Sequence, residues 1–166
     1  ALMGENVAGK STLMKILNGS FDDYTGTIEV GGQAVRVHSP AAAKAHGIGM
    51  VYQELSLARP ISVAENLLAG RLPANRWGFI DRAALMREAK RLLALVGVDV
   101  DPRQTVEEIS QHEAQLVEIA KVLGNKPCIL ILDEPTSALS REEVQRLFDI
   151  IRDLKRGGLA IVYISH

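Results

Sequence analysis

The sequence reads Gly4-Glu5-Asn6-Val7-Ala8-Gly9-Lys10-Ser11-Thr12 near its start, and this stretch decides the fold. It follows the pattern of glycine, four residues, glycine, lysine and serine, between an apolar strand tail and a helix. Glycines let the backbone curl around an anion, and amides at a helix start can donate to phosphate oxygens. We therefore expect a phosphate loop in which Lys10 neutralises the β- and γ-phosphates and Ser11 binds Mg²⁺. The residues expected to hold the nucleotide are Gly4, Asn6, Gly9, Lys10, Ser11 and Thr12.

Apolar strands alternate with helices on both sides of the middle of the chain. After the loop we expect a helix over 11–18, a hairpin of strands at 27–30 and 34–38, and a strand at 48–53. Two further strands are expected at 128–132, a continuous apolar run typical of a strand covered on both faces, and at 160–165. This alternation predicts an α/β fold with a parallel sheet, decorated by an antiparallel β hairpin.

In the middle of the chain, the sequence pattern of residues 55–111 is typical of helices joined by polar turns. Ser62-Val63-Ala64-Glu65 is a capping box, and Asp81 is expected to cap the longest helix of the chain. The buried stripe of that helix is predicted to be Leu85, Ala89, Leu92, Leu93 and Val96. We expect a single domain in which a helical subdomain, 55–111, is inserted between core segments 1–54 and 112–166. The second core segment would carry helices over 112–123 and from Ser140 to Gly157.

A second chemical signal is the apolar strand that ends in Asp133-Glu134-Pro135. Two adjacent carboxylates at a strand end are costly unless a cation or a reacting water uses them. Asp133 suits the ligand shell of Mg²⁺, and Glu134 suits the base that polarises an attacking water. Alone, the pair could equally be a helix-capping cluster, but its position after a phosphate loop favours the catalytic interpretation.

Composition limits the classes of function. The 166 residues carry 19 basic and 20 acidic side chains and a formal net charge of −1, so no basic field favours nucleic-acid binding. The single cysteine, Cys128, is expected to be a buried thiol. No apolar run approaches the roughly 20 residues that a membrane-spanning helix needs. The chain begins in a strand tail and stops at a strand tip, and we interpret it as a fragment truncated at both ends.

These residues resemble the ATP-binding subunits of ABC transporters. Gly4 to Thr12 is similar to the Walker A loop, and Ile129 to Glu134 is similar to the Walker B strand. Tyr52-Gln53-Glu54 resembles the Q-loop, Ser137-Ala138-Leu139-Ser140 resembles the D-loop, and His166 resembles the switch histidine. Order and spacing agree across nearly the whole chain.

Two further runs, 50–55 and 115–121, are similar to importers of ribose, galactose, xylose or arabinose. The resemblance implies a P-loop NTPase (RecA-like) core and an ATPase that uses ATP and Mg²⁺. It also implies the first of two nucleotide-binding domains fused in one polypeptide at the cytoplasmic face of the membrane. The implied partners are that second domain, a permease docked at 54–69 and an extracytoplasmic sugar-binding protein.

The same resemblance assigns roles to single residues. Gln53 would sense Mg²⁺ and the γ-phosphate, and would belong to both the catalytic and the metal-binding groups. His166 would contact the γ-phosphate and position water. Ser110 of one nucleotide-binding domain would face the phosphates held by the other domain, so that two domains closing face to face complete each site.

The sequence departs from the family at two places. The signature, ordinarily Leu-Ser-Gly-Gly-Gln, falls at Ile109-Ser110-Gln111-His112-Glu113, where Glu113 would repel the partner's γ-phosphate unless it turns away. Val7 stands where the family usually has a glycine, which predicts weakened nucleotide affinity. These departures keep open a regulatory module that binds nucleotide with little turnover. A soluble ABC ATPase that acts on DNA or ribosomes also stays open, because such proteins share the same core.

Overall fold

The computed structural model describes residues 9–136 and 139–164. The elements follow in the order α1 (Lys10–Leu17), β1 (Ile28–Val30), β2 (Gln33–Val35), α2 (Pro40–Ala45), β3 (Ile48–Val51), α3 (Val63–Leu67), α4 (Arg82–Leu95), the 3-10 turn η1 (Val106–Glu108), α5 (Gln111–Leu123), β4 (Ile129–Asp133), α6 (Arg141–Arg156) and β5 (Ala160–Ile164). No helix within these described residues is both long enough and apolar enough to cross a lipid bilayer.

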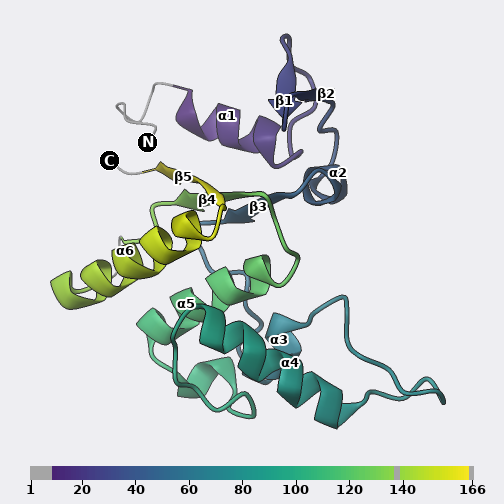
Figure 1. The fold of residues 1–166 in the computed structure, drawn as a ribbon, viewed down its shortest axis with the longest axis vertical. Helices are drawn as coiled ribbons and strands as arrows, with labels where there is room; N and C mark the ends of the chain where they lie inside the picture. Colours follow the sequence, from purple (N-terminus) through teal and green to yellow (C-terminus); the bar gives the residue numbers. More distant parts are fainter. Residues whose placement is uncertain (1–8, 137–138, 165–166) are drawn as a thin grey trace.

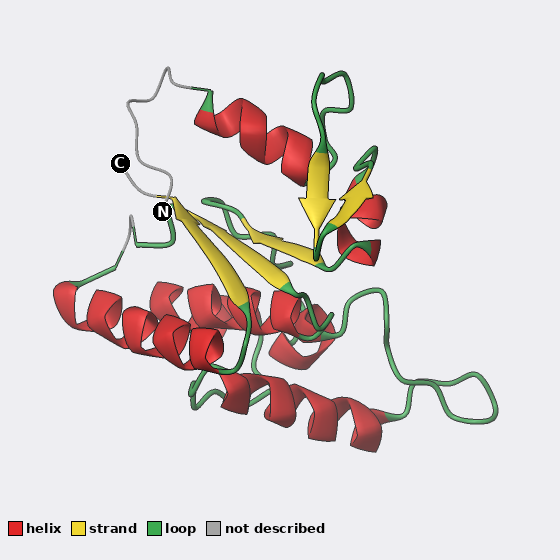
Figure 2. Ribbon diagram, turned by 45° about the horizontal axis from the view of Figure 1, so that its top comes forward, coloured by secondary structure: helices red, strands yellow, loops and turns green. Residues whose placement is uncertain are grey.

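The strands form two separate sheets (Figures 1 and 2). β3, β4 and β5 lie side by side in that order and are parallel, with Val51 opposite Leu132 and Leu132 opposite Tyr163. β1 and β2 form an antiparallel hairpin whose turn holds Gly31 and Gly32 at positive φ, a conformation that glycine adopts at little cost. The predicted α/β fold with a parallel sheet and a hairpin is therefore confirmed.

The parallel sheet is buried on both faces. Successive side chains along each strand point to opposite faces, and each face is covered by other elements. Ile131 of β4 packs in one apolar cluster with Met14 of α1 and Ile164 of β5. Its neighbours Leu130 and Leu132 belong to the other cluster, together with buried residues of α3, α4, α5 and α6. Figure 1 shows α1, α2 and the hairpin on one side of the sheet and the other helices on the opposite side. This two-sided cover explains the continuous apolar run of β4.

α3 and α4 begin at the expected signals. Ser62 and Glu65 form the predicted capping box of α3, and the side chain of Asp81 accepts a hydrogen bond from the amide of Ala84. The predicted stripe of α4 is buried throughout. However, α4 has 14 residues and α6 has 16, so the expectation that α4 is the longest was wrong. α6 packs an apolar stripe of Leu147, Ile150 and Leu154 on the core and carries charged pairs such as Asp149 and Arg152 on its exposed face.

Two expectations from apolar runs were also wrong. Cys128 is exposed, because it precedes the first residue of β4, at the amino edge of the sheet rather than inside it. Its sulfur lies 3.4 Å from the carbonyl oxygen of Gly47. β3 ends at Val51, two residues earlier than expected, so Gln53 lies beyond the strand. The proposed division at residues 55 and 111 stays a prediction.

Candidate nucleotide site

The carboxyl ends of the three parallel strands meet at one edge of the sheet, the place where open α/β sheets bind their ligands. α1 crosses the sheet with Met14 packed against Ile131 and Ile164. In both ribbon views the first turn of α1 lies at the same end of the molecule as the carboxyl ends of β4 and β5 (Figures 1 and 2). The beginning of α1 and the two strand ends can therefore contribute to a single site.

The beginning of α1 has the geometry of an anion-binding turn. Gly9 is the residue that precedes the helix, and its φ of 75° places it in the left-handed region that favours glycine. Its carbonyl accepts the first helical hydrogen bond, from the amide of Leu13 at 2.9 Å. Amides in the first turn of a helix have no partner within the helix, and they carry partial positive charge. This turn can therefore hold a phosphate group.

The structure describes part of the predicted phosphate loop. For Lys10 and Ser11 only the backbone is described, within the first turn of α1, and the side chain of Thr12 is exposed. Gly4, Asn6, Val7 and His166 lie outside the described residues, as do Ser137 and Ala138 of the stretch that resembles a D-loop.

Asp133 and Glu134 stand where β4 ends. Asp133 is the last residue of the strand and pairs with Ile164 of β5, and both carboxylate residues are partly buried. The backbone of Glu134 has a φ of 46°, an uncommon value for a residue with a side chain. Such a conformation costs about 1–3 kcal/mol and is found most often at functional sites. The chain thus turns sharply at the residue that the sequence assigns as the base.

Gln53 lies at the same level of the sheet as Glu134. Val51 and Leu132 are the last paired residues of β3 and β4, and Gln53 and Glu134 each follow two residues later. The exposed Gln53 lines a cavity of about 270 Å³ together with Glu54, Leu55, Gln111, Gln115, Leu139 and Pro135, the residue next to Glu134. The structure therefore brings the segment after β3 to the turn after β4.

Ser110, the retained residue of the altered signature, caps α5. Its side chain accepts a hydrogen bond from the amide of Glu113 at 3.2 Å, and the carboxylate of Glu113 accepts one from the amide of Ser110 at 2.7 Å. Glu113 thus folds back onto the start of its own helix, one of the two orientations that the sequence left open. Sequence reasoning missed this capping box, although serine followed three residues later by glutamate signals it.

Sequence reasoning also missed Glu118, a carboxylate on α5 that is only 3% exposed. Its partner is Ser56, in the segment after β3. No local pattern pointed to this contact, because the two residues are 62 positions apart in the sequence.

The donor set fits Mg²⁺ held mainly by a nucleotide. Within the part of the chain that the structure describes, no group of three or more histidine, cysteine, aspartate or glutamate side chains could hold a metal ion by itself. Mg²⁺ commonly binds one or two carboxylates together with phosphate oxygens and water. One aspartate at the end of β4, close to the segment that follows β3, matches that requirement.

Solved structures share this fold. One is an ATP-binding cassette of an ABC transporter in its ADP conformation, with a TM-score of 0.76 and 22% identity over 95% of this chain and 66% of that chain. Another is cbiO1 from Clostridium perfringens, part of the ABC transporter complex cbiONQ, with a TM-score of 0.79 and 24% identity over 99% of this chain and 65% of that chain.

Curated relatives are closer in sequence. A putative ribose/galactose/methyl galactoside import ATP-binding protein of Agrobacterium fabrum is 50% identical over 166 residues, which are 100% of this chain and 32% of that protein. A ribose import ATP-binding protein of Rubrobacter xylanophilus is 48% identical over 165 residues, 99% of this chain and 33% of that protein. The chain thus spans about a third of the length of these relatives.

The family model described as ABC transporter matches residues 1–137, which include the phosphate-loop pattern and the acidic end of β4. With that match, with relatives half identical over its full length and with the cassette fold around a shared sheet edge, the chain belongs to the ABC transporter family.

Proposed function

We propose that this chain is part of a nucleotide-binding domain that binds ATP and Mg²⁺ and hydrolyses ATP to power import of a monosaccharide through a membrane permease. The observation that carries the proposal is that the first turn of α1 and the carboxyl ends of β4 and β5 lie at the same end of the molecule. The names of the relatives from Agrobacterium fabrum and Rubrobacter xylanophilus support sugar import as the process that hydrolysis drives.

The proposed chemistry is phosphoryl transfer to water. Lys10 and the amides of residues 9–12 hold the β- and γ-phosphates, and Gly4 and Asn6 complete the loop around them. Bound Mg²⁺ would supply charge neutralisation on those phosphates, with Ser11, Gln53 and Asp133 as its protein ligands.

The remaining residues act on the attacking water. Glu134 accepts its proton, and His166 holds it in line with the γ-phosphate. Ser110 of the partner nucleotide-binding domain contributes from the opposite side of the nucleotide. Loss of the γ-phosphate removes a charge that holds the two domains together, which opens them.

The proposed partners follow from the family. A second nucleotide-binding domain, fused in the full-length chain, faces this one, and the permease docks on residues 54–69, hereafter the docking segment. A sugar-binding protein outside the cytoplasm delivers the substrate, and the whole assembly lies at the cytoplasmic face of the membrane. Within the chain we assign residues 55–111 to the helical subdomain, and 1–54 and 112–166 to the core.

The proposal is tested with the full-length protein. We expect wild-type protein to co-purify with a permease and to release phosphate from ATP, and we expect Glu134→Gln to bind ATP but release phosphate about 10²–10⁴-fold more slowly. ATP hydrolysis by a wild-type protein that co-purifies with no permease would favour the soluble ATPase that acts on DNA or ribosomes. ATP binding with no turnover in the wild type would favour the regulatory module.

A further inference from the structure

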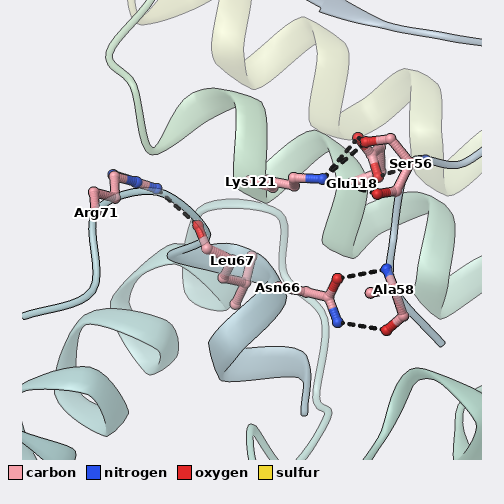
Figure 3. A network of polar contacts seen from close by, with 7 residues as sticks. All are labelled: Ser56, Ala58, Asn66, Leu67, Arg71, Glu118 and Lys121. Carbon is pink, nitrogen blue, oxygen red and sulfur yellow. Dashed lines mark hydrogen bonds and ion pairs between the residues drawn. The ribbon is translucent and has the colours of Figure 1, made fainter. Parts of the chain in front are cut away.

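Glu118 is a buried charge in an otherwise apolar part of α5. The residue is 3% exposed, and the buried residues around it on the helix include Val117, Ile119 and Ala120. Its carboxylate accepts two hydrogen bonds from Ser56, one from the amide at 3.2 Å and one from the hydroxyl at 2.6 Å (Figure 3). A buried carboxylate is costly unless it is paired, so this contact determines how α5 and the segment after β3 fit together.

Lys121 closes the arrangement. Its ammonium group lies 3.6 Å from the carboxylate of Glu118 and donates hydrogen bonds to the hydroxyl of Ser56 at 2.8 Å and to its carbonyl at 3.3 Å. We call the three residues Ser56, Glu118 and Lys121 the clasp. The clasp engages the amide, the hydroxyl and the carbonyl of Ser56, so that residue has little freedom to move relative to α5.

The docking segment is fastened at its other end as well. The guanidinium group of Arg71, two residues after the segment, donates to the carbonyl of Leu67 at 3.0 Å and also to the carbonyl of Gly124. Gly124 is the residue that terminates α5. Between these points the buried side chain of Asn66 exchanges two hydrogen bonds with the backbone of Ala58, at 2.8 and 2.9 Å. The segment is therefore tied to α5 near both ends and braced in the middle.

The clasp is a poor device for stability alone. Replacing a buried ion pair by apolar residues of similar volume is often neutral or stabilising, because desolvation of the charges offsets their attraction. Apolar residues at positions 118 and 121 together would extend the neighbouring buried apolar stretch of α5. An apolar contact is not directional, so it would not fix the position of Ser56 relative to α5 as these hydrogen bonds do.

We propose that Glu118 is a positioning residue that fixes the docking segment to α5 in the orientation that the permease recognises. This inference rests on the proposed function, which assigns residues 54–69 to the permease and Ser110, at the start of α5, to the partner's nucleotide. The clasp makes α5 and the docking segment one rigid unit. When ATP binding displaces Ser110 at the start of α5, the docking segment then moves together with α5 and carries this motion to the permease.

The test uses the full-length protein and its permease in detergent. The two variants are Glu118→Leu, which removes the clasp, and Glu118→Gln, which can still accept from the amide of Ser56 but lacks the charge for Lys121. The matched control is Asp153→Asn, which breaks an exposed ion pair between Asp153 and Arg156 on α6. Each protein is measured for permease affinity, for ATP hydrolysis without the permease, for melting temperature and for hydrogen exchange at the amide of Ser56.

We expect Glu118→Leu to bind the permease about tenfold more weakly and to lose exchange protection at Ser56. Its hydrolysis without the permease should match the wild type, and its melting temperature should fall, because removing one partner of a buried pair is destabilising. Glu118→Gln should retain most of the affinity, and Asp153→Asn all of it. Equal permease affinity in wild type, Glu118→Leu and Glu118→Gln overturns the inference alone. A wild-type protein that binds no permease overturns the proposed function, and the inference with it.

Discussion

The backbone amide of Glu134 donates a hydrogen bond to the carbonyl of Ile164, 3.1 Å away, and so extends the ladder between β4 and β5 past its last paired residue. Because of this bond the proposed base is fixed to the sheet by its backbone as well as by the strand before it. The same bond holds Glu134 at a φ of 46°, where residues with a side chain are strained. The position is thus maintained by the sheet at some cost in stability.

This strain predicts an asymmetry between the two neighbouring carboxylates. Glu134→Gly is expected to leave the free energy of unfolding unchanged or to raise it by up to about 1 kcal/mol, because glycine adopts positive φ without strain. Asp133→Gly, in extended strand backbone, is expected to lower it by about 0.5–1 kcal/mol. Both variants lose a carboxylate and both should lose hydrolysis. Chemical denaturation of the full-length variants measures the difference, and an equal loss of stability in the two would contradict the argument.

A second prediction concerns the altered signature. The carboxylate of Glu113 accepts a hydrogen bond from the amide of Ser110 at 2.7 Å, so its negative charge stabilises the start of α5. We expect Glu113→Gln to change ATP hydrolysis by less than about threefold, because a glutamine at this position also caps the helix. Phosphate release by the full-length protein checks this. A gain of tenfold or more would mean instead that the carboxylate faces the γ-phosphate and repels it.

The sequence predicted the parts of the fold that depend on local signals. Gly31-Gly32 marked the hairpin, Ser62 and Asp81 marked two helix starts, and the apolar run after Cys128 marked the strand buried on both faces. These features could be predicted because turn chemistry, capping and side-chain periodicity act over a few neighbouring residues. That the phosphate loop and the acidic strand end belong to one site was predicted from the order of the two motifs along the chain, not from a local interaction.

What the sequence did not predict depends on contacts between distant segments or on where a strand stops. The hydrogen bonds between Ser56 and Glu118 join residues 62 positions apart, and each residue alone looks like an ordinary surface group. Cys128 belongs to an apolar run, and the sequence therefore predicted that its side chain is buried. The side chain is exposed because the residue lies just before the start of β4. α6 packs an apolar stripe of Leu147, Ile150, Ile151 and Leu154 on the core, and its expected range was not compared in length with that of α4.

A third prediction is a pH dependence at the start of α3. The hydroxyl of Ser62 donates to the carboxylate of Glu65 at 2.6 Å, and this bond, followed by one from the amide of Ser62, lowers the pKa of Glu65 below its usual value. Since the folded-state pKa is the lower one, the ionised carboxylate stabilises the protein above the unfolded pKa of about 4.3, and the benefit is lost as pH falls through the folded pKa.

The comparison that isolates this effect is wild type against Glu65→Gln, which retains a capping side chain but does not titrate. We expect the wild type to melt at the higher temperature at pH 7 and the difference between the two proteins to shrink on acidification toward pH 3. Thermal unfolding of the full-length proteins at a series of pH values measures it. A difference that stays constant with pH would show that ionisation of Glu65 contributes nothing to folding.

The last prediction concerns Val7, which stands in the phosphate loop where the family usually has a glycine. If its backbone must adopt positive φ, as the backbone of Gly9 does two residues later, a β-branched side chain there costs on the order of 1–3 kcal/mol. Val7→Gly is then expected to tighten ATP binding by about five- to 150-fold.

The matched variant is Gly9→Ala, which introduces strain at a φ of 75° in place of relieving it and should weaken binding. Both affinities are measured by titrating the full-length protein, carrying Glu134→Gln to prevent turnover, with ATP. Equal affinity of Val7→Gly and wild type would show that the loop accommodates valine without strain, and that weak binding is not how this chain differs from its family.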